Sequence, residues 1–171
     1  MTVTLRPWRT DDAADLAAAI GNPRVQANLR DGLPLPYTEA DALDYIAYAA
    51  HPEHYAFAID ADGRAVGSIA VTRGGNIHRR TGELGYYLAE PYWHRGIATE
   101  AVRQMTAWVF SHTDLLRVYA EPFSGNCASR RVLEKAGYRH EGTLRANAVK
   151  AGRVLDMELY AAVRADYMEQ E

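Results

Sequence analysis

The apolar positions of this chain change repeatedly between the two-residue spacing of strands and the wider spacing of helices. Runs rich in strand-forming residues occupy 2–8, 54–61, 64–73, 83–89 and 115–123, and two more lie between 138 and 163. Asp62 and Gly63 separate the second run from the third, and this pair is typical of a tight hairpin turn. The last two runs join at 150–153. The pattern therefore predicts about seven strands.

Four segments carry helical spacing, at 11–20, 39–50, 97–109 and 128–137. Thr38 and Asn126 stand at the N-cap positions of the second and fourth segments, and Gly137 stands where the fourth must end. In the third, the apolar residues from Ile97 to Val109 lie on one face that can pack against a sheet. We therefore predict an α/β (α+β) fold with a mixed sheet of about seven strands flanked by about four helices.

The connection at 21–38 is long and irregular, with three prolines and two glycines. Such connections inside compact domains are often functional. We expect this segment, together with the last hairpin, to shape a substrate groove.

The composition narrows the function. A length of 171 residues suits a single domain, 1–171, and the net charge of -3 argues against general nucleic-acid binding. No apolar run approaches the roughly 20 residues that cross a bilayer, and the N-terminus lacks the apolar core of a signal peptide. One cysteine, Cys127, provides no thiolate cluster, and Pro52 separates His51 from His54. We predict a cytoplasmic protein that binds neither membrane nor nucleic acid and holds no metal.

The stretch YYLAEPYWHRGIATEAVRQM, residues 86–105, contains the strongest chemical signal. A strand ends before Pro91, and Gly96 stands at the first turn of the next helix. The free backbone N–H groups of such a turn point the same way, with the positive end of the helix behind them. Because Gly96 has no Cβ, an anion can approach the backbone closely, and His94 and Arg95 add polar groups at the mouth. The stretch predicts a cradle for a pyrophosphate, although glycines at such turns often serve only to turn the chain.

Two segments, RGIATEAV from Arg95 and EPFSGNCASRRVLEKAGY from Glu121, together resemble the GNAT acetyltransferase superfamily. The first is similar to that family's acetyl-CoA loop, Gln/Arg-x-x-Gly-x-Gly/Ala. The second is similar to its helix Asn-x-x-Ala-x-x-x-Tyr-x-x-x-Gly-Phe, whose positions are held here by Asn126, Ser129, Leu133, Gly137 and Tyr138. Over nearly the whole chain, the resemblance is closest to the branch of bacterial ribosomal-protein N-terminal (alanine/serine) acetyltransferases.

The resemblance implies a GNAT-type, mostly antiparallel sheet and an N-acetyltransferase that uses acetyl-CoA as its cosubstrate. The acceptor would be a primary amine, either a protein N-terminal α-amine or a small-molecule amine. The pyrophosphate of acetyl-CoA would lie on the amides of 95–99, the pantetheine along the edge of the strand that ends at Leu88, and the thioester between that strand and the helix capped by Asn126. The residues implied in binding acetyl-CoA are Leu88, Arg95, Gly96, Ile97, Ala98, Thr99 and Asn126.

Three positions depart from the family pattern. Trp93 stands where the wider superfamily has Gln or Arg, although this branch commonly departs there too. His94 replaces a small residue of this branch and could narrow the pyrophosphate pocket. Leu133 replaces the tyrosine that often protonates the leaving thiolate, so that proton must come from elsewhere.

Glu83 is the best candidate for the catalytic base, because a carboxylate on the strand beside the thioester can accept the amine's proton. Asp156 and Glu158 on the last strand are rivals, and an ordinary strand-end charge is the alternative reading of Glu83. Ser129 could donate a hydrogen bond to the thiolate, or serve only as a small residue that permits close packing. Asn126 suits both a helix cap and a partner of the pantetheine.

Several other interpretations remain beside this one. The chain could be a GNAT-like acyl-CoA binding module without turnover. It could also be a nucleotide-phosphate binder that shares only the cradle, but no Lys-Ser/Thr follows Gly96 to support P-loop chemistry. Cys127 as an acyl-carrying nucleophile lacks a histidine nearby in the sequence. We expect two of the three basic residues Arg130, Arg131 and Lys135 to be solvated, and the third could reach the ribose 3′-phosphate. A homodimer is compatible with the sequence.

The ordinary pKa values of amines distinguish the two acceptor types. An α-amine with a pKa of about 7.8 is roughly 15% neutral at pH 7, whereas a lysine amine with a pKa of about 10.4 is only about 0.04% neutral. A site with one modest base therefore favours N-termini or weakly basic small amines.

Overall fold

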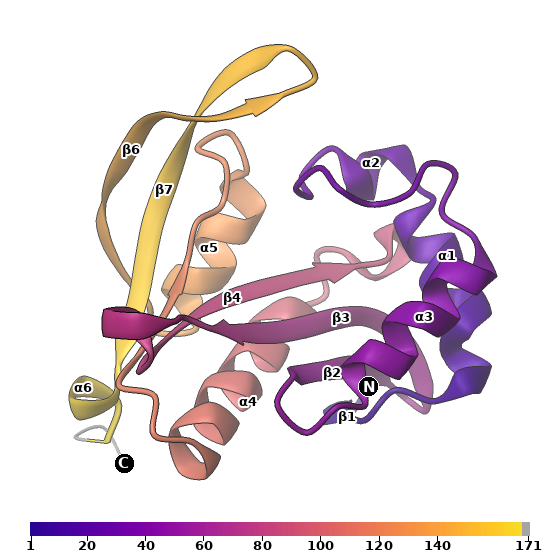
Figure 1. The fold of residues 1–171 in the computed structure, drawn as a ribbon, viewed down its shortest axis with the longest axis horizontal. Helices are drawn as coiled ribbons and strands as arrows, with labels where there is room; N and C mark the ends of the chain where they lie inside the picture. Colours follow the sequence, from indigo (N-terminus) through magenta and orange to yellow (C-terminus); the bar gives the residue numbers. More distant parts are fainter. Residues whose placement is uncertain (169–171) are drawn as a thin grey trace. The chain divides into compact units, whose positions relative to one another are not determined.

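The computed structural model describes residues 1–168, whose strands form one open sheet of seven in the order β1-β2-β3-β4-β5-β7-β6 (Figure 1). The strands are β1 (Val3–Arg6), β2 (Tyr55–Ala61), β3 (Arg64–Arg73), β4 (Thr81–Leu88), β5 (Arg117–Ala120), β6 (Arg139–Lys150) and β7 (Arg153–Val163). Strands β4 and β5 pair in parallel, whereas β1–β2, β5–β7 and β6–β7 pair antiparallel. The prediction of a mixed, mostly antiparallel sheet of seven strands is confirmed.

The same residues contain six α-helices and three short 3-10 turns. The helices are α1 (Ala13–Ile20), α2 (Pro23–Gln26), α3 (Glu39–Ala49), α4 (Ile97–His112), α5 (Cys127–Lys135) and α6 (Arg164–Met168). The turns are η1 (Thr10–Asp12), η2 (Asn76–His78) and η3 (Glu90–Tyr92). The four predicted helices are all present, and α2 and α6 are two short additions.

Local sequence signals explain several of these boundaries. The side chain of Asn22 accepts a hydrogen bond from the Arg24 N–H, and Pro23 occupies the first turn of α2, where its missing N–H costs nothing. Thr38 caps α3 as predicted, and the Asp41 carboxylate in turn accepts a hydrogen bond from the Thr38 N–H. Helix α1 starts later than expected because residues 10–12 form a 3-10 turn. These caps give each helix a defined first residue.

The chain divides into two compact units, of which the first comprises 1–70 and 85–101, and the second 71–84 and 102 onward. In the first unit, α1 and α3 share an apolar core of Ala13, Leu16, Ile20, Tyr37, Ala42 and Ile46. An added Cβ at Gly67 of β3 would lie 2.2 Å from the Tyr87 carbonyl oxygen of β4. Only glycine therefore permits these two backbones to approach so closely.

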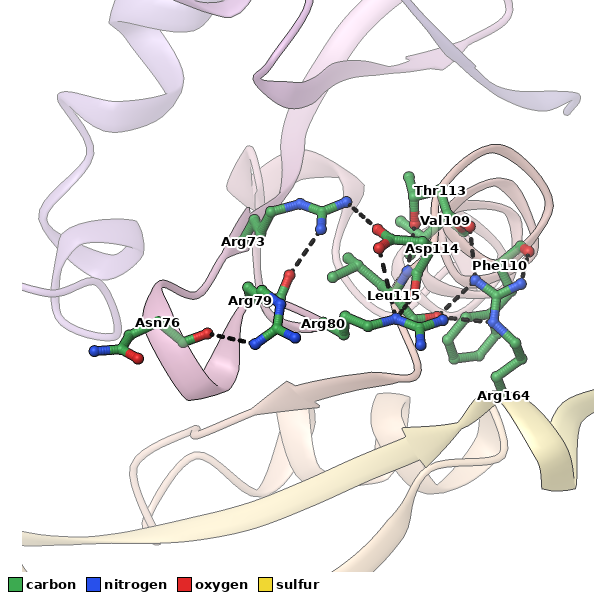
Figure 2. A network of polar contacts seen from close by, with 10 residues as sticks. All are labelled: Arg73, Asn76, Arg79, Arg80, Val109, Phe110, Thr113, Asp114, Leu115 and Arg164. Atoms are coloured by element: carbon green, nitrogen blue, oxygen red, sulfur yellow. Dashed lines mark hydrogen bonds and ion pairs between the residues drawn. The ribbon is translucent and has the colours of Figure 1, made fainter.

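In the second unit, the end of α4 depends on Arg164, the first residue of α6 (Figure 2). Its guanidinium donates hydrogen bonds to the carbonyl oxygens of Phe110, Thr113 and Leu115. Helix C-termini leave such carbonyls without partners inside the helix, and a cation there also meets the negative end of the helix dipole. Arg164 thus closes α4.

Tyrosine hydroxyls in the first unit differ in their partners. The Tyr37 hydroxyl donates to the Asp41 carbonyl oxygen at 3.3 Å, and the Tyr45 hydroxyl lies 3.0 Å from the Ser68 hydroxyl. The Tyr87 hydroxyl is buried and makes no hydrogen bond of ordinary geometry among the described residues, although it lies near the same Ser68 hydroxyl. A buried hydroxyl without a partner is destabilising, since it has lost its hydrogen bonds to water.

We predict that Tyr87→Phe raises the free energy of unfolding by about 1 kcal/mol, because it removes the unsatisfied hydroxyl and keeps the ring. Tyr37→Phe is the matched control, and it should lower that free energy because it removes a hydrogen bond. Urea denaturation followed by circular dichroism measures both. Equal destabilisation by the two changes would show that the Tyr87 hydroxyl has a stabilising partner.

Candidate active site

The connection from β4 to α4 places the predicted anion cradle in the first unit. Strand β4 ends at Leu88, η3 contains Pro91, and α4 begins at Ile97, one residue after Gly96. The backbone takes positive φ angles at His94 (60°) and Gly96 (77°), so the chain turns sharply before the helix starts. Glycine adopts this conformation without strain.

The first helical turn of α4 has the geometry of an anion site. Its first internal hydrogen bond runs from the Glu100 N–H to the Gly96 carbonyl oxygen, at 3.1 Å. The N–H groups of 97–99 therefore precede the hydrogen-bond ladder of the helix, at its positive end. A Cβ built on Gly96 would have no atom within 4 Å beyond its chain neighbours and its own helix backbone, so the approach to this backbone is open. The residues present fit a bound phosphate group.

Trp93 holds the end of β4. Its indole Nε1–H donates a hydrogen bond of 2.9 Å to the Leu88 carbonyl oxygen. This contact fixes the orientation of the peptide group that follows Leu88, because an amide plane cannot rotate independently of its carbonyl. The residue that departs from the wider family pattern is thus a structural support of the strand end.

Glu90 ties the irregular connection at 21–38 to η3. Its carboxylate accepts a hydrogen bond from the Asn22 side chain at 2.7 Å and pairs with the Arg24 guanidinium. The Arg24 guanidinium also lies over the Trp93 ring, 5.6 Å from its centroid. The sequence did not predict these contacts of Glu90 with Asn22 and Arg24. The residues lie 66 to 68 positions apart, and neither their types nor their spacing indicates that they meet.

Helix α5 in the second unit begins and ends as predicted. The Asn126 side chain accepts a hydrogen bond from the Ser129 N–H at 3.2 Å, so Asn126 is confirmed as the cap. Gly137 has a φ of 90°, and the Tyr138 N–H donates to the Leu133 carbonyl oxygen at 3.0 Å. The Gly137 N–H also donates to the Glu134 carbonyl oxygen, at 3.1 Å, and these two bonds form a Schellman motif. Leu133 is fully buried, and Ser129 is half-buried on the same side of the helix.

A buried carboxylate, Glu158, organises the chain near the start of α5. It accepts hydrogen bonds from Ser124 Oγ (2.7 Å) and Thr143 Oγ1 (2.8 Å), and its other contact is His140 Nε2 at 2.6 Å. These contacts, with the Ser124 hydroxyl foremost, lower the pKa of Glu158 to about 2. A carboxylate held ionised this firmly is a weak base.

The other rival carboxylate is also engaged. Asp156 Oδ1 accepts the Ala146 N–H at 2.7 Å, where β6 has an irregular register and Ala146 has a φ of 52°. Glu83 lies instead at the last of three Cα pairs between β4 and β5, opposite Tyr119. Asp156 therefore supports a distortion of β6.

The Arg130 side chain makes contacts within the protein. Its Nε lies 3.4 Å from the Tyr160 hydroxyl, and its Nη1 donates to the Ser124 carbonyl oxygen at 3.3 Å. Tyr160, which is buried, donates in turn to Glu134 at 2.8 Å. This network binds α5 to β7 and to the segment before Asn126, whereas Arg131 and Lys135 are exposed.

The predicted site residues fall into two groups. Leu88 and the backbone of 95–99 belong to the first unit, and Glu83, Asn126 and Ser129 belong to the second. Cys127 is exposed at the start of α5. Within residues 1–168, no group of three or more His, Cys, Asp or Glu side chains is arranged to hold a metal ion. No helix in that range is long and apolar enough to span a membrane.

Comparisons with known proteins identify the family. The sequence pattern of the Acetyltransferase (GNAT) domain family matches residues 2–139, so this chain belongs to the GNAT acetyltransferase family. The uncharacterized N-acetyltransferase YoaA of Bacillus subtilis (strain 168) is 36% identical over 87 residues, which are 51% of this chain and 49% of YoaA. This chain thus aligns with about half the length of that relative.

Solved structures agree with this assignment. RimJ of Mycobacterium smegmatis, solved in complex with CoA-disulfide, is 27% identical with a TM-score of 0.82, over 96% of this chain and 83% of that one. Spermidine N-acetyltransferase of Vibrio cholerae, solved with CoA and spermine, has a TM-score of 0.82 at 18% identity, over 97% and 98% of the two chains. The second likeness concerns the fold alone.

The Glu158 cluster predicts a dependence of stability on pH. Because the pKa of Glu158 is lower in the folded protein than its ordinary value, its ionised form stabilises the fold above that ordinary value. This contribution is lost as the pH falls from about 4.5 to about 2. Denaturation at a series of pH values should therefore show a smaller loss in Glu158→Gln than in the parent over this range. Parallel pH profiles would contradict the assignment.

Proposed function

We propose that this protein is an acetyl-CoA-dependent N-acetyltransferase that acts on a primary amine, and that residues 1–171 form one such domain. The observation that carries the proposal is the open turn at Gly96, where N–H groups at the start of α4 can receive the pyrophosphate of acetyl-CoA. Membership of the GNAT family and the CoA bound to RimJ support it. Arg95, Gly96, Ile97, Ala98 and Thr99 would provide these contacts.

The chemistry begins with attack of the neutral amine on the thioester carbonyl carbon. The new C–N bond forms, the carbonyl oxygen gains negative charge, and the C–S bond then breaks to release CoA. A backbone N–H near Leu88 would stabilise the oxyanion, and Trp93 would keep that part of the chain in place. Asn126 would hydrogen-bond the pantetheine while it caps α5.

The proton balance requires a base for the amine and a proton for the thiolate. Glu83 is the proposed base, because it lies on β4, the strand that ends at Leu88 beside the proposed thioester position, whereas the low pKa of Glu158 makes that carboxylate a weak base. Ser129 is proposed to hydrogen-bond the leaving thiolate or to relay a proton from water, since Leu133 carries no hydroxyl. The products are an acetylated amine and the free thiol of CoA.

The proposed acceptor is an α-amine at a protein N-terminus, or a small amine of similar basicity, because such amines are partly neutral near pH 7. The 29% identity to the putative ribosomal N-acetyltransferase YdaF of Bacillus subtilis (strain 168), over 62% of this chain and 57% of YdaF, favours the ribosomal-protein branch of the family. We further propose that the protein works in the cytoplasm, without a metal, membrane or nucleic acid. A GNAT-like module that binds acyl-CoA without turnover is the second candidate, and release of free CoA thiol with amine acceptors distinguishes the two. The sequence is also compatible with a homodimer.

Gly96→Val should weaken acetyl-CoA binding at least tenfold, because a branched side chain would occupy the approach to the cradle. Isothermal titration calorimetry measures the affinity. Gly152→Val is the matched control, since Gly152 has a φ of 72° and similarly open space but lies in the β6–β7 turn. Unchanged affinity in a folded Gly96→Val variant, or equal losses in both variants, would refute the cradle.

Glu83→Gln should reduce turnover by roughly 10²- to 10⁴-fold and leave acetyl-CoA affinity intact, because the base is lost and the cofactor contacts are not. The loss should shrink at higher pH, where more of the amine is already neutral. Thiol release at several pH values gives the profile, and Asp156→Asn serves as the comparison. A loss that is uniform across pH would indicate positioning instead of proton transfer.

A further inference from the structure

The first unit contains a pocket of about 390 Å³ on the side of α3 and the irregular connection. Its lining comes from four parts of the unit: the end of α1, the connection between α2 and α3, the middle of α3, and the end of β4. The residues are Ile20, Leu29, Arg30, Asp31, Gly32, Leu33, Tyr37, Tyr45 and Tyr87. A volume of this size suits a small ligand or one or two residues of a peptide.

The lining is mainly aliphatic and aromatic. Tyr37, Tyr45 and Tyr87 are packed in or against the core that α1 and α3 share. Burial raises the pKa of Tyr37 to about 12 and raises the pKa of Tyr45 and Tyr87 above the ordinary value. All three phenols are therefore neutral near pH 7. The pocket offers apolar contact and ring faces, with no tyrosinate charge.

The fixed charges of the lining cancel. Arg30 and Asp31 are its two charged residues, both are exposed, and they have opposite signs. A polyamine or an aminoglycoside carries several positive charges, which require several carboxylates for recognition. The pocket supplies one carboxylate beside one guanidinium. Its charge therefore disfavours polycations and suits a ligand with one amine and an apolar body.

The pocket adjoins the proposed chemistry through β4. Tyr87 lines it, and the next residue is Leu88, the strand end to which Trp93 is bonded. Consecutive Cα atoms are about 3.8 Å apart, so the Leu88 peptide lies within one residue of the pocket wall. An apolar group bound against Tyr87 can thus carry an amine within reach of that strand end.

We infer that this pocket binds the apolar or aromatic group next to the acceptor's amine, so that the preferred acceptor is a monoamine with a bulky apolar substituent. This inference rests on the proposed function and specifies its substrate class. A peptide that begins with phenylalanine and a free arylalkylamine share this chemistry. Peptides that begin with serine, and polyamines, lack it.

Two matched pairs of acceptors test the inference by thiol release with acetyl-CoA. A peptide beginning with Phe is compared with the same peptide beginning with Ser, and phenethylamine is compared with spermidine. We expect kcat/KM to be at least tenfold higher for the apolar member of each pair. The better of the two apolar acceptors identifies whether the natural source is a peptide or a free amine.

Variants locate the preference in the pocket. Leu33→Trp should fill part of the volume and reduce kcat/KM for the Phe peptide at least tenfold, with little change for the Ser peptide. Leu35→Trp is the control, because Leu35 lies two residues further along the same connection, is 70% exposed and does not line the pocket. Equal effects of the two substitutions, or equal rates for the Phe and Ser peptides, would overturn the inference and leave the proposed function intact.

A binding measurement separates this inference from the proposed activity. Ligand-observed NMR should detect phenethylamine bound to the parent protein without acetyl-CoA, with a signal reduced in Leu33→Trp and retained in Leu35→Trp. Binding of this pattern without turnover of any acceptor would support the pocket and refute the transferase. Absence of phenethylamine binding at millimolar concentration would refute the pocket, whatever the enzyme turns over.

Discussion

The turn between β4 and α4 is the constraint on which the proposed chemistry depends. A helix cannot satisfy its first N–H groups internally, and here the preceding residues adopt a conformation that only glycine takes up without strain at Gly96. The protein therefore has a set of aligned donors that needs no charged side chain to attract an anion. Trp93 and Glu90 then hold the strand end before this turn and the connection beside it.

The polar cluster in the second unit explains why Glu158 is a weak base. Glu158 is surrounded by hydroxyl groups and His140, which stabilise its charge and lower its affinity for a proton. Arg130 and Tyr160 extend the contacts to α5. The cost of burying an anion is offset by this full set of partners, and the result is a fixed start for the helix that carries Asn126 and Ser129.

The sequence predicted what depends on local chemistry. Hairpin turns at Asp62-Gly63, caps at Thr38 and Asn126, and the end of α5 at Gly137 all follow from the residues at those positions. Asn22 and Pro23 form the cap and first turn of α2, so the sequence also contained a local signal for this helix, which we did not predict. The bond from Trp93 to Leu88, the Glu90 tie and the tyrosine pocket depend on packing between distant segments, which no local pattern encodes. The roles proposed for Glu83 and Ser129 remain predictions.

The contacts of Arg164 affect the order in which parts of the protein can be completed during synthesis on the ribosome. The carbonyls that it caps lie 49 to 54 residues earlier in the chain, one in the last turn of α4 and two just after that helix, whose other end forms the cradle. During synthesis, α4 emerges long before its cap has been made. Until residue 164 has been synthesised, these carbonyls are therefore hydrated instead of bonded to the guanidinium. Completion of this central helix is thus a late event in biosynthesis, even though its sequence lies in the middle of the chain.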